Sequence, residues 1–283
     1  EVDDVASAIY YAADNNADVI SMSFGGGDSI TVKEAILYAY NSGSILVSSS
    51  GNGGSNVLQY PCAYDKVICV ASTNSDDSAA SYSNYGNWVD ISAPGTGIIS
   101  TKFDDSYVSL SGTSMSAPLV AGMIGLIKSL FDKNQTEILN ALKETGTAVN
   151  FSGFIINKTN VYSSILYFDN FVPMVNLISP INNYSTKVLN QTFICNASDW
   201  QLSNITLKIW EDNGKLYYNE TKYVSGIFNE TSFDVNLESN EYSWNCFVND
   251  DKGNKNYAST NYSIYTNYKK INLNSPINNY YSN

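Results

Sequence analysis

The sequence contains no histidine, and all 15 of its basic residues are lysines, so arginine is absent as well. Without imidazole groups, these residues provide neither a histidine general base nor a histidine metal ligand. Without guanidinium groups, they provide no bidentate clamp for a carboxylate or a phosphate. Any chemistry carried by these 283 residues therefore uses hydroxyl, amide, carboxylate, thiol or amine groups.

Positive charge is also scarce. The 27 acidic residues give a net charge of -12 and a pI of about 4.3. Such a surface repels polyanions, so neither nucleic acid nor an anionic lipid surface is expected as a partner. With 43% hydrophobic residues the chain is too apolar for intrinsic disorder. No apolar run looks long enough to cross a bilayer, and we expect no membrane span.

Two regions of the chain follow different hydrophobic patterns. In residues 1–168, segments with helical spacing alternate with short apolar runs. Val5–Ala13 has helical spacing and residues 17–23 form an apolar run; residues 32–42 and 44–49 repeat the pattern. Buried strands that alternate with helices predict an α/β domain whose mostly parallel sheet has helices on both faces.

The second region, residues 172–266, shows short alternating segments separated by turn residues. Six strand candidates follow one another: 192–196, 204–210, 215–223, 231–237, 242–248 and 257–265. This spacing predicts an all-β antiparallel sandwich. The pattern of Val175–Tyr184 recurs in Ile271–Tyr280, so we expect residues 270–283 to be the first strand of a second, truncated repeat. Because the chain also begins with Glu1, we expect it to be an internal fragment.

The segment around Ser114 is the most informative part of the sequence. It reads S-G-T-S-M-S-A-P from residue 111, and the helix expected over residues 117–130 is apolar almost all round. A nucleophilic serine needs a tight turn at the start of a helix, where backbone N–H groups and the helix dipole face developing negative charge. On the residues alone, the alternative is a buried helix that is capped by a serine.

The segment G-T-S-M-S-A-P-x-V-A-G at residues 112–122 resembles the nucleophile segment of the subtilisin-like serine peptidases, the subtilases. Further segments follow the order of that family. Residues 48–54 resemble its oxyanion segment, residues 21–26 its substrate-binding strand, and residues 60–61 with 67–71 the wall of its specificity pocket. The resemblance covers the first region and implies a subtilisin-like α/β fold.

The resemblance implies a serine endopeptidase that acts on protein or peptide substrates and needs no cofactor for its chemistry. Ser114 would be the nucleophile that forms an acyl-enzyme, and Asn52 would donate to the oxyanion together with the Ser114 N–H. The alternative for Asn52 is a purely structural role as a turn residue between glycines. Six further residues would bind substrate: Ser23, Phe24, Gly25, Ser50, Gly51 and Tyr60.

The sequence also departs from the family. Subtilases order their triad Asp, His, Ser, and the first two members would have to precede Glu1. The fragment alone would then lack its general base and be close to inert. Tyr64, Val67 and Asp90 lie where some relatives bind a cation, so a structural Ca²⁺ is possible there, although a solvated Asp90 is the simpler interpretation. No residue is assigned as a metal ligand.

The four cysteines form two local pairs, Cys62 with Cys69 and Cys195 with Cys246. Neither pair has C-x-x-C spacing, which together with the lack of histidine disfavours zinc. We expect disulfides, with buried thiols as the alternative. Cys195 and Cys246, with Trp210 between them and Trp244 beside the second, resemble the inter-sheet bridge of an immunoglobulin-like sandwich. Disulfides indicate an oxidising compartment, so the protein is expected to be secreted or at a cell surface.

Two hypotheses of different class follow. The first is a secreted or surface-anchored serine endopeptidase followed by immunoglobulin-like repeats, which act as spacers or bind a possible cell-surface ligand. The alternative is a non-catalytic surface adhesion protein with a degenerate protease domain.

Overall fold

The computed structural model describes residues 2–267, and the chain divides after Phe168 into two compact units. The first unit ends at Phe168 and the second begins at Asp169. The strand expected over residues 270–283 lies outside the described residues.

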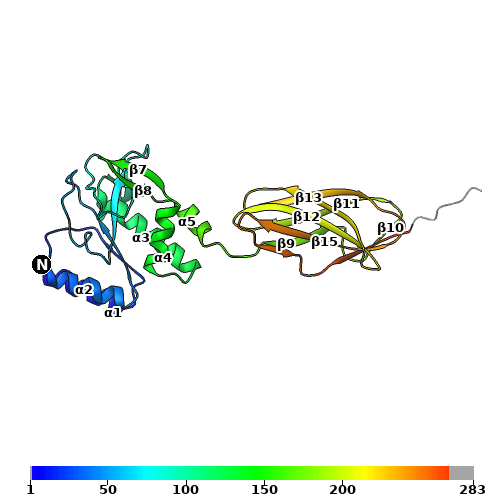
Figure 1. Ribbon diagram of the computed structural model, residues 1–283, viewed down its shortest axis with the longest axis horizontal. Helices are drawn as coiled ribbons and strands as arrows, with labels where there is room; N and C mark the ends of the chain where they lie inside the picture. Colours follow the sequence, from blue (N-terminus) through cyan, green and yellow to red (C-terminus); the bar gives the residue numbers. More distant parts are fainter. Residues whose placement is uncertain (1, 268–283) are drawn as a thin grey trace, which may run out of the picture. The chain divides into compact units, whose positions relative to one another are not determined.

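The first unit contains both helices and strands, which alternate near its N-terminus and then follow one another in runs (Figure 1). In order its elements are α1 (Val2–Asp14), β1 (Val19–Met22), α2 (Ile30–Asn41), β2 (Ile45–Ser49), β3 (Ile68–Thr73), β4 (Ile91–Pro94), β5 (Ile98–Thr101), β6 (Tyr107–Leu110), α3 (Thr113–Leu130), α4 (Gln135–Glu144), β7 (Thr147–Phe151), β8 (Phe154–Lys158) and α5 (Val161–Tyr167). The helices and strands predicted from the hydrophobic pattern are all present at the expected places.

One sheet with strand order β1-β2-β3-β4-β8-β7 forms the centre of the first unit. Its neighbours pair in parallel except for β7 and β8, which are antiparallel. Successive residues of a strand point to opposite faces. Accordingly, Ile45 and Val47 of β2 pack in a cluster with α3, whereas Leu46 packs in a cluster with α1 and α2. The predicted mostly parallel sheet with helices on both faces is confirmed.

Helix α3 is the central helix of this unit. Its residues Val120, Ile124 and Ile127 are fully buried, and it packs against β1 to β4. Its length and composition alone are also compatible with a membrane span. The expectation that no apolar run is long enough was therefore too strict, although six residues of α3 are buried in the protein core.

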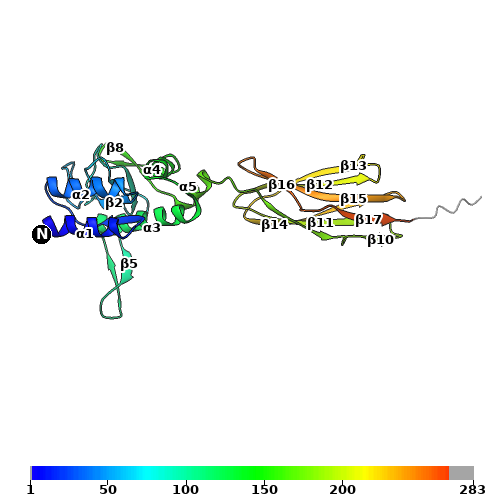
Figure 2. The same cartoon turned by 90° about the horizontal axis from the view of Figure 1, so that it is seen from below.

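Strands β5 and β6 form a separate antiparallel hairpin. Figure 2 shows this hairpin projecting from the rest of the first unit. Phe103, near its tip, is 93% exposed, so the hairpin makes little contribution to the core.

The second unit consists of strands. They are β9 (Met174–Ser179), β10 (Tyr184–Thr186), β11 (Asn190–Ser198), β12 (Leu202–Glu211), β13 (Leu216–Tyr223), β14 (Phe228–Asn236), β15 (Glu241–Asp250), β16 (Lys255–Tyr257) and β17 (Tyr262–Thr266). One sheet has the order β10-β17-β15-β12-β13, with β16 paired to β15, and the other has the order β14-β11-β9. Five of the six predicted strand segments each match one of the strands β11 to β15, whereas the segment 257–265 covers the end of β16, a loop and most of β17.

The two sheets of the second unit enclose one core. The Cys195–Cys246 disulfide connects β11 in one sheet with β15 in the other, with 6.4 Å between the Cα atoms. Trp244 is fully buried and packs edge-on against Phe193, whereas Trp210 is only half-buried. In the first unit, Cys62 and Cys69 are bridged as well. Both predicted disulfides are thus formed.

Candidate active site

Three segments of the first unit meet at one edge of the sheet. Ser23 directly follows β1, and Asn52 lies in the loop that follows β2. Because β1 and β2 are parallel neighbours, their carboxyl ends lie side by side, which is where α/β proteins place their sites. Ser114 is the second residue of α3, and its Oγ lies 3.4 Å from the carbonyl oxygen of Ser23. Residues far apart in the sequence therefore form one site.

Pro118 makes the Ser114 carbonyl available for a contact with Ser23. It lies inside α3 and has no N–H, so the carbonyl of Ser114, four residues earlier, loses its helical hydrogen-bond donor. The Ser23 Oγ donates to that carbonyl instead, at 2.9 Å. The proline in the motif thus frees the group that joins α3 to the end of β1.

The Asn52 side chain is held by Thr113. Its Oδ1 accepts hydrogen bonds from the Thr113 N–H at 2.9 Å and from Thr113 Oγ1 at 3.0 Å. Thr113 Oγ1 in turn accepts from the Gly51 N–H at 3.1 Å. With Oδ1 fixed in this way, Nδ2 lies toward Gly112, where a Cβ atom would come within 3.2 Å of it.

Two hydrogen-bond donors remain free at the start of α3. Among the described residues, Asn52 Nδ2 donates to no protein atom, and the same holds for the Ser114 N–H in the first turn of α3. The positive end of the helix dipole adds to their effect. This arrangement can stabilise negative charge on an oxygen next to Ser114.

Asn84 organises the loop that carries Asn52. Its Oδ1 accepts from the Gly53 N–H at 2.9 Å and the Ser55 N–H at 3.3 Å, and its Nδ2 donates to the Ser50 carbonyl at 2.9 Å. Asn84 is not predictable as a site residue from the sequence, because it lies in an irregular segment without any periodic signal. Thr113 stands inside the subtilase-like motif, but its contact with Asn52 is visible only in the structure.

The structure differs from expectation at Ser50, which was predicted to bind substrate. Ser50 is fully buried; its N–H donates to Val70, its Oγ donates to the Asn84 carbonyl, and its own carbonyl accepts from Asn84. Since all its polar groups are engaged internally, Ser50 positions the loop instead. The adjacent Gly51 has φ +97°, and a Cβ there would lie 2.7 Å from Asn84 Nδ2, so the position requires glycine.

The segment after Ser23 forms one border of the site. Phe24 and Gly25 are exposed, and their main-chain groups form no hydrogen bond with any described residue. The next residue, Gly26, pairs with Tyr60 through two backbone hydrogen bonds of 2.8 and 3.1 Å. Gly25 and Tyr60 also line a cavity of about 200 Å³. Open main-chain groups beside a cavity can bind an extended peptide as an added strand.

No charged group acts directly on this site. Among residues 2–267, no Asp, Glu or Lys forms a hydrogen bond or salt bridge with Ser114 or Asn52.

The position at which a cation was expected contains a charged pair. Asp90 forms a salt bridge with Lys143 at 2.7 Å and accepts a hydrogen bond from the Cys69 N–H. The Lys143 ammonium group therefore already neutralises the Asp90 carboxylate.

The model of the subtilase family matches residues 1–176, which is more than half of the chain. The chain belongs to the subtilase family. This agrees with the place of Ser114, Asn52 and Ser23 at one edge of a parallel sheet.

Similar proteins support this subtilase assignment. The thermophilic serine proteinase of Bacillus sp. (strain AK1) is 41% identical over 167 residues, which is 58% of this chain and 41% of that protein. Thermitase of Thermoactinomyces vulgaris is also 41% identical over 167 residues, or 58% of this chain and 59% of thermitase. The solved structure of the prenylagaramide maturation protease PagA has a TM-score of 0.56 and 26% identity, covering 60% of this chain and 68% of that one. The chain thus spans between 41% and 59% of these two curated relatives.

Proposed function

We propose that the protein containing this chain is a serine endopeptidase that hydrolyses peptide bonds through an acyl-enzyme on Ser114. The carrying observation is the orientation of Asn52: Thr113 holds its Oδ1, so its Nδ2 is free to donate beside the Ser114 N–H. Membership of the subtilase family and the proteinase names of the relatives support the proposal.

In this mechanism Ser114 Oγ attacks the carbonyl carbon of the substrate, and its proton passes to a general base. The carbonyl oxygen becomes an oxyanion that accepts hydrogen bonds from Asn52 Nδ2 and the Ser114 N–H. As this intermediate collapses, the base passes its proton to the leaving nitrogen, which departs as the amine and leaves an acyl-enzyme that water then hydrolyses to the free acid and Ser114. No step needs a cofactor. Because the sequence has no histidine, an imidazole base would have to come from outside these 283 residues.

The substrate class follows from the segment Phe24–Gly25. Its free main-chain groups suit the N–H and C=O groups of an extended peptide, and one substrate side chain would enter the cavity lined by Gly25 and Tyr60. Protein or peptide substrates are therefore proposed.

We infer that the second unit is an immunoglobulin-like module that acts as a spacer or binds a cell-surface ligand. Two sheets around one core, joined by the Cys195–Cys246 bridge, support this inference. The two disulfides favour an oxidising compartment, and hence a secreted or cell-surface protein. A purely adhesive role is not favoured, because it does not explain the ordered donors around Ser114.

Organophosphonate labelling of the native protein tests the proposed chemistry. Only an activated hydroxyl reacts at neutral pH, so we expect one adduct, mapped by mass spectrometry to Ser114, together with loss of peptide hydrolysis. Ser114→Ala should abolish the adduct. Ser129→Ala, near the other end of α3, serves as control and should label like the wild type. Equal labelling of Ser114→Ala would refute the proposal.

A further inference from the structure

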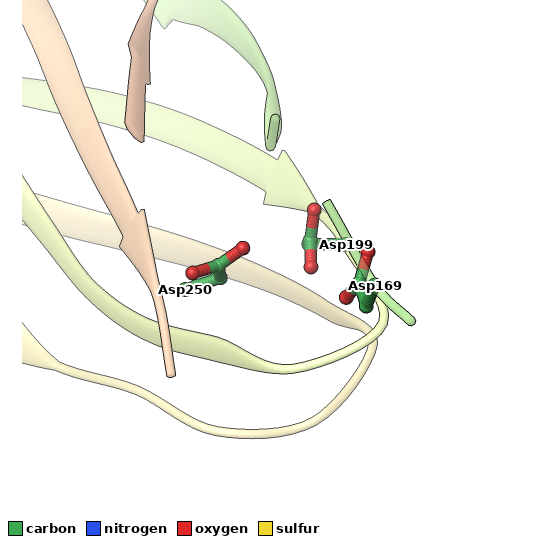
Figure 3. A group of neighbouring side chains, drawn as sticks. All are labelled: Asp169, Asp199 and Asp250. Carbon is green, nitrogen blue, oxygen red and sulfur yellow. The ribbon is translucent and has the colours of Figure 1, made fainter. Parts of the chain in front are cut away.

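Three aspartates of the second unit come together at one end of its two sheets. Asp169 is the first residue of the unit, Asp199 directly follows β11, and Asp250 is the last residue of β15. One carboxylate oxygen from each of them lies within 4.8 Å of the other two. Figure 3 shows the three carboxylates converging on a common space. The proposed peptidase chemistry uses none of these residues.

Each carboxylate is held in place by its own turn. Asp169 Oδ1 accepts from the Phe171 N–H at 3.1 Å, and Asp199 Oδ1 accepts from the Gln201 N–H at 3.2 Å. Asp250 is held by backbone and side-chain donors from Asn254 at 2.8 Å. The carboxylates cannot easily turn away from one another without breaking these bonds.

The second carboxylate oxygen of Asp169, Oδ2, is not held by any hydrogen bond from the described residues. The Asp169 side chain is only 6% exposed, and its Oδ2 is buried without any hydrogen-bond partner. A buried oxygen of this kind is costly unless something binds it. Its carboxylate faces the other two (Figure 3).

The local charge balance is also unfavourable. Within the described part of the chain, none of the three aspartates forms a salt bridge, and Asp250 is only 3% exposed. Burial, with a further contribution from the Asp250 charge, raises the pKa of Asp169, although the hydrogen bond from the Phe171 N–H and the Lys252 charge partly oppose this. Burial and the neighbouring aspartates likewise raise the pKa of Asp199. Three carboxylates in this position would be stabilised by a cation.

We propose that Asp169, Asp199 and Asp250 bind a calcium ion. All the donor atoms are carboxylate oxygens, which suit hard cations such as Ca²⁺ and not zinc or copper. Two oxygens on opposite sides of one Ca²⁺, each about 2.4 Å from it, lie about 4.8 Å apart. The cluster is within this span. Mg²⁺ demands tighter octahedral geometry and keeps more of its water, so it should bind more weakly.

The ion would connect three segments that are distant in the sequence. Asp199 and Asp250 border two loops that are already joined by the Asp251 N–H, which donates to the Gln201 carbonyl at 3.0 Å. Asp169 lies on the strand-free segment that enters the unit. Calcium would therefore attach the entry of the unit to its two end loops and stabilise the folded state by binding it selectively.

Calcium dependence of the full 283-residue chain tests the proposal. We expect about 10 mM Ca²⁺ to raise the Tm of the second unit by about 5 °C or more relative to EDTA, if the Kd lies in the range of about 10⁻⁴–10⁻³ M typical of extracellular modules. Tb³⁺ should bind the same site and luminesce on excitation of Trp200, beside Asp199. Ca²⁺ should displace it at lower concentration than Mg²⁺.

Isosteric variants separate a metal site from a structural carboxyl group. Asp169→Asn and Asp199→Asn keep an oxygen for their turns but remove one charge. We expect both to be at least as stable as wild type in EDTA and to lose the Ca²⁺ shift and the Tb³⁺ signal. Asp251→Asn makes the same charge change next to the cluster and should respond like wild type. Equal destabilisation of Asp169→Asn with and without Ca²⁺, no Ca²⁺ response of wild type, or an equal response to Mg²⁺ would overturn the proposal.

Discussion

The two units of this protein place their polar groups in different ways. In the first unit, the polar groups around Ser114 are uncharged hydroxyls, amides and backbone groups, and hydrogen bonds such as that from Thr113 to Asn52 fix them in place. In the second unit, three carboxylates, two of them buried, gather at one end of the sheets, and the Asp169 Oδ2 has no partner. The first pattern suits the proposed peptidase chemistry, whereas the second suits the proposed calcium ion.

The disulfides show the same contrast. Cys62 and Cys69 are 7 residues apart and close a small loop, whereas Cys195 and Cys246 are 51 residues apart and join two sheets. In the chain-entropy description, a bridge over the longer loop stabilises more, about 4 kcal/mol against about 2.5 kcal/mol. The second unit therefore depends more on its covalent link than the first.

Removal of the disulfides tests this contrast and should give the largest effect. Replacing Cys195 and Cys246 by alanine should destabilise the second unit by about 4 kcal/mol and lower its Tm by more than 10 °C. The matched double replacement of Cys62 and Cys69 should cost less. Scanning calorimetry of the full chain measures both. If the two double variants lose the same stability, loop length does not explain the contrast.

Asn52→Leu tests the proposed role of the uncharged polar groups in the first unit. Loss of one oxyanion donor should lower kcat of the native protein by about two to three orders of magnitude, with little change in KM, because the donor acts on charge that exists mainly in the transition state. Steady-state kinetics on a short peptide measures this. The exposed Asn87→Leu is the control. A rise in KM with unchanged kcat would show that Asn52 contacts the ground state instead.

Asn84 gives a smaller effect, because it acts through the loop. Asn84→Ala leaves the Gly53 and Ser55 N–H groups without their acceptor and should lower kcat by roughly tenfold to a hundredfold, at a cost of about 1–3 kcal/mol. Asn84→Asp keeps the acceptor but loses the donor to Ser50, so it should recover part of the activity. Failure of Asn84→Asp to recover any activity would show that this acceptor does not position Asn52.

Tyr242, in the second unit, should give the smallest effect on stability. Burial is the main cause that raises the pKa of Tyr242 to about 12, and the neighbouring Tyr217 adds to it. An unfolded tyrosine ionises near pH 10, so the stability from this group is present below pH 10 and is lost as the pH rises toward 12. At pH 11 the loss is about 1.3 kcal/mol.

Tyr242→Phe should therefore lose less stability than wild type between pH 9 and pH 11, roughly by that amount. Urea unfolding of the full chain at several pH values measures the difference. Tyr223→Phe, at a side chain that is 87% exposed, is the control. If the two variants show the same pH dependence, burial of Tyr242 has no such effect.

Motifs at the ends of predicted elements made much of the fold and site predictable. Ser114 and Ser23 lie in segments that resemble subtilase motifs, and this resemblance predicted that both belong to one site. The hydrogen bonds from Thr113 to Asn52 join residues 61 positions apart and leave no periodic signal. The contact from Gly53 to Asn84 spans 31 positions and is equally hidden. Tertiary packing alone creates these contacts.

The same reason explains why the aspartate cluster was not predicted. Asp169, Asp199 and Asp250 have no common spacing in the sequence. Asp199 and Asp250 meet because β11 and β15 terminate at the same end of the unit, and Asp169 lies on the segment that enters the unit there.

Ser50 shows the opposite error. Its place in a recognised motif suggested contact with substrate, although the fold buries it completely.

Trapping of the acyl-enzyme tests the central claim most directly. The native protein is mixed with an activated peptide ester, quenched in acid and digested, and the peptides are mapped by mass spectrometry. Our account predicts that the acyl group is found on Ser114 and accumulates in a burst before steady-state turnover, and that Ser114→Ala shows neither the adduct nor hydrolysis. An acyl group on another residue, or turnover that persists in Ser114→Ala, would contradict it.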